Sequence, residues 1–219
     1  MKKVLFALLI LFSYAAHAQS NYIGESDPNA RALLKKVSAK YKAFHSISTG
    51  ITLQVEDSKG QKLSTQKGNL SLKGNKYRLA MNEDLSFSDG KSIYNYDKAA
   101  GEIQITRINP KDNLLTPQKL FTNFYDKDYL YRLSDVVKSG SITLQPVELT
   151  PLDKTLPFFK VILNINKSTN QIVSAQIFEK SGTRYLYSLN GFRTNSSMPE
   201  NLFTFNKSDF PGVEVIDLR

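Results

Sequence analysis

The chain has 219 residues, a length that suits one domain or two small ones. It contains no cysteine, so disulfides and thiolate chemistry are excluded and a core must hold together by burial alone. The formal net charge of +9 favours anionic membrane surfaces or acidic partners, although a moderate positive charge also simply aids solubility.

The first residues are typical of a secretory signal peptide. Lys2 and Lys3 precede the apolar run VLFALLILFSYAA, and Ala16-His17-Ala18 provides a cleavage site. A membrane anchor is the alternative, but the run is shorter than the roughly 20 residues that span a bilayer. We therefore expect residues 1–18 to be removed and residues 19–219 to form a single exported domain that does not meet nucleic acid.

Residues 28–45 are predicted to form an amphipathic helix. Asp27 can cap its start and Pro28 suits the first helical position. The apolar residues recur at the spacing of one helical face, at Ala30, Leu33, Leu34, Val37, Tyr41 and Phe44.

After this helix the apolar residues alternate with polar ones, which is typical of half-buried strands. Turn signals separate the segments, so we expect an antiparallel sheet, sandwich or barrel of about ten strands. The expected strands are 47–56, 62–73, 76–82, the two arms of a hairpin within 85–97, 102–108, 141–149, 158–166, 171–179, 183–192 and 201–206.

The alternation stops between residues 109 and 134. Thr116-Pro117 is a good helix start, and apolar residues from Leu120 to Leu133 suggest two short helices rich in aromatic side chains. Helices inserted in the middle of a sheet must cover something apolar.

The hairpin LSFSDGKSIYNYD, residues 85–97, turns at Asp89-Gly90. A two-residue type I′ turn would pair Ser88 with Lys91 and Phe87 with Ser92. One face of the hairpin then carries Leu85, Phe87, Tyr94 and Tyr96, and this apolar face should point inward.

Few residues point to chemistry. His45 is the only histidine after residue 18, which excludes histidine triads and multi-histidine zinc sites from the mature chain. Two carboxylate pairs, Glu83-Asp84 and Asp126-Asp128, could serve a hydrolase, and the second pair could hold calcium, but solvated turns or helix ends explain both better. We therefore expect no catalytic residue, no metal and no cofactor.

The order of the segments resembles the LolA family of periplasmic outer-membrane lipoprotein carriers. The helix ALLKKVSAKYKAFHSIS leads into ITLQV, and then come GNLSLKGNKYRL, SDGKSIYNYD, TPQKLF and the terminal LFTFNKSDFPGVEVID. The resemblance implies an α+β fold: an incomplete, strongly curved antiparallel β-barrel of about ten or eleven strands, with a helical lid over an apolar cavity.

The resemblance also implies a function and partners. The protein would be a monomeric periplasmic carrier that shields the acyl chains of lipoproteins between the inner and outer membranes. It would be loaded by an ABC transporter of the LolCDE type and would deliver to a LolB-type receptor or directly to the outer membrane. The expected cavity residues are Leu53, Val55, Leu70, Leu72, Leu79, Leu85, Phe87 and Tyr94, and the expected lid residues are Leu33, Val37, Phe121 and Phe124.

One motif departs from the family. Its best-known members carry an Arg-Pro pair whose arginine bonds to the lid, where this chain has Gly74 and Asn75; Arg78 lies further along the strand. Two alternatives stay open beside the lipoprotein carrier: a carrier of another lipid, and a module of the same fold with a filled core that senses or docks other envelope proteins. An enzyme ranks last, because the polar residues converge on no reaction.

Overall fold

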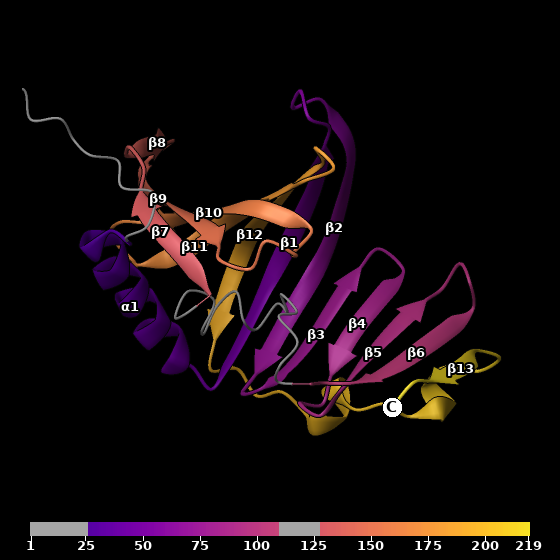
Figure 1. The fold of residues 1–219 in the computed structure, drawn as a ribbon. Helices are drawn as coiled ribbons and strands as arrows, with labels where there is room; N and C mark the ends of the chain where they lie inside the picture. Colours follow the sequence, from indigo (N-terminus) through magenta and orange to yellow (C-terminus); the bar gives the residue numbers. More distant parts are fainter. Residues whose placement is uncertain (1–25, 110–127) are drawn as a thin grey trace, which may run out of the picture.

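The computed structural model describes residues 26–109 and 128–219. Its described part is one large curved antiparallel sheet with a single α-helix near one end (Figure 1). The strand order is β13-β6-β5-β4-β3-β2-β1-β12-β11-β10-β9-β7, with β8 paired to β9. Among the strands of residues 26–109 and 128–219, only β13 and β6 run parallel. Because the end strands β13 and β7 do not pair, the sheet stays open.

The strands follow one another mostly as hairpins, so neighbours in sequence are neighbours in the sheet. Their bounds are β1 Ser46–Glu56, β2 Lys62–Lys73, β3 Lys76–Met81, β4 Asp84–Ser88, β5 Ser92–Asp97, β6 Glu102–Arg107, β7 Tyr129–Leu133, β8 Val137–Ser139, β9 Ile142–Pro151, β10 Phe158–Asn166, β11 Gln171–Glu179, β12 Arg184–Thr194 and β13 Glu214–Asp217. Two short 3-10 helices, η1 Glu200–Phe203 and η2 Lys207–Asp209, precede β13.

Helix α1, Pro28–Lys42, forms where the apolar spacing predicted it. Asp27 caps it by accepting a hydrogen bond from the Asn29 backbone N–H at 2.7 Å. Its buried face consists of Ala30, Leu34, Val37, Ser38 and Tyr41. This face packs on one side of the sheet, which we call the inner face; the opposite side is the outer face.

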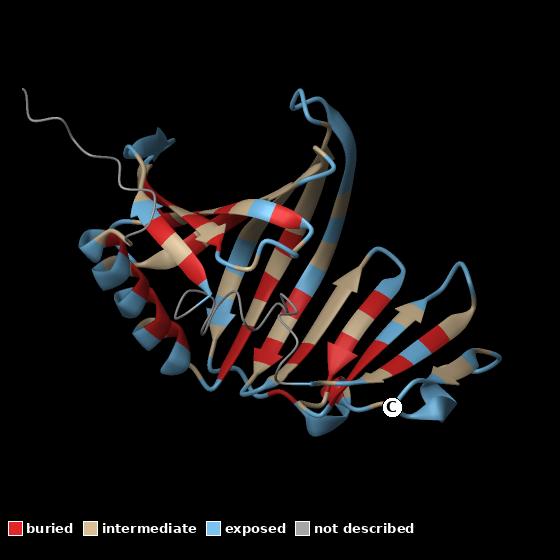
Figure 2. Cartoon of the chain, viewed as in Figure 1, coloured by how far each residue is buried: buried red, intermediate tan, exposed pale blue. Residues whose placement is uncertain are grey.

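The two faces of the sheet carry separate cores. The larger core joins α1 to the inner face of the strands, and it includes Leu70, Val147 and Leu163. The smaller core lies on the outer face of β4–β6 under the C-terminal segment, around Phe87 and Ile103. Figure 2 shows buried residues along α1 and in alternating bands across the strands. A curved sheet thus buries different faces at its two ends.

Three sequence predictions are wrong in this part of the chain. Residues 129–133 form strand β7, which pairs with β9 at the sheet edge, and not a helix. Residues 201–206 contain a 3-10 helix and no strand, while β13 was not predicted. The signal peptide and the helix start at Thr116-Pro117 lie outside the described residues.

The Asp89-Gly90 hairpin has a longer connection than predicted. Phe87 pairs with Tyr94 and Ser88 with Ile93, so four residues, 89–92, turn the chain. The Asp89 carboxylate holds this turn by accepting the backbone N–H groups of Lys91 and Ser92, both at 2.8 Å. Gly90 has φ +89°, and an added Cβ would lie 2.3 Å from the Asn75 side chain. The register shifts by two residues, so the predicted face assignment within the hairpin is kept.

Candidate functional site

The inner face of the sheet is mostly apolar across β1–β3 and β9–β12, although Ser64 and Gln66 of β2 lie on it beside Val55 and Leu53. Strand register places Val55 beside Tyr185 and Leu53 beside Tyr187. It also places Leu70 beside Leu79. Side chains alternate along each strand, so these residues share one face with the core under α1.

Helix α1 is firmly tied to the edge of this face. The Arg31 Nε donates to the Tyr131 hydroxyl at 2.8 Å, and the Asp27 backbone N–H donates to the Tyr131 carbonyl at 2.9 Å. The Tyr41 hydroxyl accepts the Ile172 backbone N–H at 3.0 Å. Burial raises the pKa of Tyr41 to about 12, although this backbone hydrogen bond opposes the shift. These bonds join α1 to β7 and β11 as part of the core.

Beyond α1, part of the inner face is only partly buried. The residues concerned are apolar or aromatic, and they lie toward the ends of β1, β3, β11 and β12: Leu53, Val55, Leu79, Met81, Ile177, Tyr185, Tyr187 and Leu189. We call these eight residues the inner strip. Gly68 lies between Ile51 and Met81 on neighbouring strands, and because it has no side chain, the apolar surface is recessed at this position. Burial raises the pKa of Tyr187, so its hydroxyl is neutral at physiological pH.

The structure divides the predicted cavity residues into three groups. Leu53, Val55 and Leu79 lie in the inner strip. Leu70 and Leu72 share the inner face but are buried in the larger core. The remaining three are Leu85, Phe87 and Tyr94, and the register places them on the outer face.

The prediction that all eight residues line one face is therefore wrong for Leu85, Phe87 and Tyr94. Phe87 pairs with Arg78, which alternates with the inner-face residues of β3. Phe87 is 0% exposed and its ring stacks on that of Phe210, with centroids 6.2 Å apart. The C-terminal segment completes this core, so the apolar side of the hairpin meets packed rings.

The predicted lid residues have different outcomes. Val37 is buried in the larger core and Leu33 packs against it. Phe121 and Phe124 lie outside the described residues.

Arg78, the nearest arginine to the missing Arg-Pro pair, lies on the outer face. Its Nη1 donates to the Leu202 carbonyl at 3.1 Å and its guanidinium lies 5.5 Å from the centre of the Phe87 ring. Burial lowers the pKa of Arg78, and nearby Asp209 opposes this shift.

The sequence analysis did not predict five of the eight residues of the inner strip: Met81, Ile177, Tyr185, Tyr187 and Leu189. The segment 183–192 was predicted to be a strand, but its pairing with β1 was not predicted. The alternation of Tyr185, Tyr187 and Leu189 was the available signal, because three apolar residues at a spacing of two mark one face of a strand.

The side chains of the inner strip suit the binding of a ligand and do not suggest a catalysed reaction. These side chains are aliphatic, thioether or phenolic, so they attract apolar ligands without directional demands. Among residues 26–109 and 128–219, no group of His, Cys, Asp and Glu side chains could hold a metal ion. In the same residues, no helix has the length and apolarity needed to cross a membrane.

Fold and face together define the class of protein: an open-barrel β protein that presents an apolar inner face beside a docked helix. The chain belongs to the LolA family, because the family model described as "Outer membrane lipoprotein carrier protein LolA" matches residues 44–206. No curated protein matches the chain significantly.

Solved structures are similar to this chain at low sequence identity. An uncharacterized conserved protein from Thermus thermophilus is 12% identical, with a TM-score of 0.57, over 86% of this chain and 99% of that one. A DUF1329 family protein from Desulfovibrio piger is also 12% identical, with a TM-score of 0.50, over 85% and 99%. A LolA superfamily protein from Nitrosomonas europaea is 15% identical, with a TM-score of 0.44, over 80% and 97%.

Proposed function

We propose that this protein is a periplasmic carrier that shields the acyl chains of lipoproteins on its inner face and moves them from the inner to the outer membrane. The observation that carries the proposal is the inner strip. It is a partly buried apolar surface in a chain of the LolA family, whose description names a lipoprotein carrier.

The physical problem of such a carrier is the exposure of acyl chains to water. Each buried methylene is worth about 0.8 kcal/mol, so two long chains are worth on the order of tens of kcal/mol. A surface that replaces water for the whole chain must be apolar and extended. It must also be partly accessible, as the inner strip is, because a fully packed face would have to be opened first.

The energy for loading must come from a partner. The sequence has no nucleotide-binding motif, so we infer an inner-membrane transporter of the LolCDE type as the loading partner. Delivery would go to a LolB-type receptor or directly to the outer membrane. Export would use the signal peptide at residues 1–18.

A second function is favoured by the packed part of the inner face. Leu34, Val37 and Tyr41 of α1 fill the space over β9–β11, which suits a module that docks other envelope proteins without a lipid. The two functions differ in whether acyl chains contact the inner strip.

A release assay tests the carrier. Purified mature protein is added to spheroplasts, and the lipoproteins that appear in the supernatant are measured. Carrier function predicts release by the wild type and its loss in a Leu53→Asp, Leu79→Asp double variant. Thr52→Asp is the matched control, because Thr52 neighbours Leu53 but points to the outer face. Circular dichroism must show that both variants are folded. A docking module predicts that no lipoprotein is released by any of these proteins.

A further inference from the structure

One row of residues on the inner face changes from apolar to polar at the boundary between β3 and β4. The register aligns Leu70, Leu79, Ser86, Asn95 and Gln104 in one row across five strands. The first two residues of this row are apolar and the last three are uncharged polar residues. The inner strip therefore continues directly into a polar surface on the same face of the same sheet.

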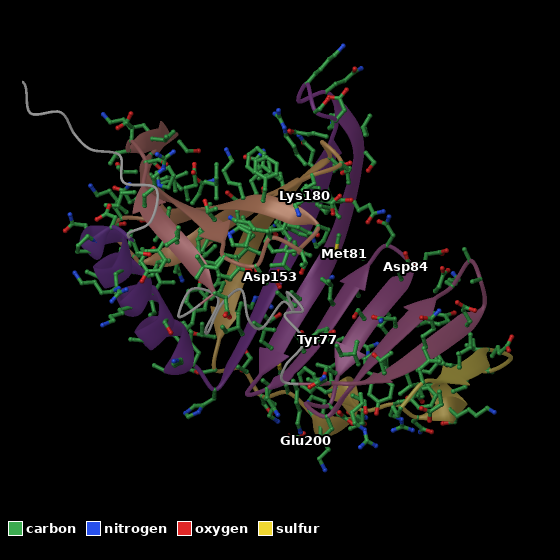
Figure 3. The ribbon with its side chains drawn as sticks, in the orientation of Figure 1. Tyr77, Met81, Asp84, Asp153, Lys180 and Glu200 are labelled. Atoms are coloured by element: carbon green, nitrogen blue, oxygen red, sulfur yellow. The ribbon has the colours of Figure 1, made fainter. Side chains whose placement is uncertain are left out.

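Hydrogen bonds connect this polar surface to the apolar part. Tyr77 is only 4% exposed, with its ring in the larger core, and its hydroxyl lies 3.2 Å from the Ser86 hydroxyl. The Ser86 hydroxyl donates to the Asn95 Oδ1 at 2.7 Å, which leaves the Asn95 amide hydrogens for other acceptors. Asn95 and Gln104 are exposed. We call Tyr77, Ser86, Asn95 and Gln104 the polar ladder; Tyr77 is labelled in Figure 3.

Charges are segregated between the two faces of β1–β6. Every lysine and arginine within these strands lies on the outer face: Lys62, Lys67, Lys73, Lys76, Arg78 and Arg107. Three of their four carboxylates lie on the inner face: Asp84, Asp97 and Glu102. Figure 3 labels Asp84 at the start of β4 and Met81 at the end of β3, where the register places them side by side. A basic protein thus presents an acidic rim to whatever occupies its inner face.

We infer that the polar ladder is a subsite for the uncharged ester or amide head of an acylated ligand, and that the acidic rim rejects anionic phospholipid heads. The inference rests on the proposed function, because the acyl chains must lie on the inner strip for the head to reach the ladder. The amide of Asn95 and the hydroxyl of Ser86 match the carbonyls and hydroxyls of a glyceryl ester or a peptide.

The acidic rim supplies selectivity that an apolar surface lacks. An inner strip alone would bind any lipid with suitable chains, including the phospholipids that surround a lipoprotein in the membrane. A phosphate placed on the ladder would face Asp84, Asp97 and Glu102 without a basic side chain from β1–β6 on that face. Like charges at such a surface oppose binding, whereas a neutral head meets no such penalty.

Displacement of a hydrophobic dye from the full mature protein tests this inference. The competitors are dioctanoylglycerol, an uncharged dioctanoylglyceryl-cysteine peptide with a blocked N-terminus and an amidated C-terminus, and dioctanoyl phosphatidylglycerol, all with the same chains. At low salt the wild type should bind both neutral ligands about tenfold more tightly than the phospholipid. The two neutral ligands separate a free glycerolipid from an acylated protein as the source of the shared chemistry.

Two variants assign this preference to named groups. The triple variant Asp84→Asn, Asp97→Asn, Glu102→Gln should bring the ratio close to one by strengthening phospholipid binding, while Glu56→Gln on the outer face leaves it unchanged. Asn95→Leu should weaken the neutral ligands severalfold without weakening the dye. Its matched control is Asn69→Leu, an exposed outer-face position on β2.

The outcomes separate the inference from the function on which it rests. Equal affinities of the wild type for all three ligands would overturn the head-group subsite and leave the carrier intact. A wild type that binds neither the dye nor any of the ligands would overturn both. An unchanged ratio in the triple variant would overturn the role of the acidic rim.

Discussion

Phe87 and Tyr94 stack on one another from directly opposed positions of β4 and β5, with ring centroids 4.8 Å apart and ring planes 16° from parallel. Phe205 stacks on Tyr94 and Phe210 on Phe87. These four rings form the centre of the outer-face core, which holds the C-terminal segment against the sheet. The aromatic hairpin thus stabilises the sheet from behind and leaves its inner face free.

Truncation of Phe87 should therefore affect stability and spare binding. Phe87→Ala removes a fully buried ring and should lower the free energy of unfolding by about 3–5 kcal/mol. Urea denaturation measures this loss, and dye binding per folded molecule should stay at the wild-type value. Phe159→Ala is a matched control at a half-exposed ring and should cost less than about 1 kcal/mol. A stable Phe87→Ala protein that no longer binds the dye would show that Phe87 belongs to the binding site and not to the outer-face core.

The Tyr41 hydroxyl should anchor α1 to the sheet. Tyr41→Phe leaves the ring but removes the acceptor for the Ile172 backbone N–H, so a buried donor loses its partner. We expect a loss of about 1–3 kcal/mol in the free energy of unfolding, and faster hydrogen exchange at the Ile172 amide. Tyr96→Phe is the control, because its hydroxyl makes no hydrogen bond to the described residues. Slow exchange at Ile172 in the Tyr41→Phe protein would show that another group satisfies this amide.

The turn at Asp89 should make stability depend on pH. Burial alone would raise the pKa of Asp89, but hydrogen bonds from the Ser92 and Lys91 backbone N–H groups and from Tyr94 outweigh it and lower the pKa below 3.8. A carboxylate with a lowered folded-state pKa stabilises the fold above its unfolded pKa, and this contribution is lost as the pH falls through the folded value. The wild type should exceed Asp89→Asn in stability at neutral pH, and the difference should shrink below about pH 4. Thermal melts of both proteins between neutral and acidic pH measure this. A difference that stays constant over that range would exclude the charge of Asp89 as its cause.

Local pattern was sufficient to predict most of the sheet. Alternating residues in β1, β2, β10 and β11 predicted those strands nearly to their ends, and the spacing of Leu34, Val37 and Tyr41 predicted α1. The spacing of apolar residues predicts these elements well because each of them buries one face against a core. Segment 129–133 misled the prediction because Tyr-Leu-Tyr-Arg-Leu is apolar at both helical and strand spacings. Its state is decided by pairing with β9.

The candidate site depended on information that local pattern lacks. The predicted hairpin face, with Leu85, Phe87 and Tyr94, was right within the hairpin, but nothing local says which side of the sheet faces α1. That relation follows from the whole strand register, in which Phe87 pairs with Arg78 and alternates with Ser86 and Ser88. The C-terminal rings of Phe205 and Phe210 are equally distant in sequence. The sequence alone therefore does not distinguish the two apolar faces of this sheet. They are distinguished only by the segment that packs on each one.

Native mass spectrometry shows whether the protein carries acylated molecules on its inner face. The wild type, the Leu53→Asp, Leu79→Asp double variant and the Thr52→Asp control are exported, purified from the periplasm without detergent, and measured before and after lipid extraction. We predict bound acylated lipoprotein on the wild type and on Thr52→Asp, and none on the folded double variant. A wild type that carries no acylated molecule, or a double variant that carries as much as the wild type, would contradict this prediction.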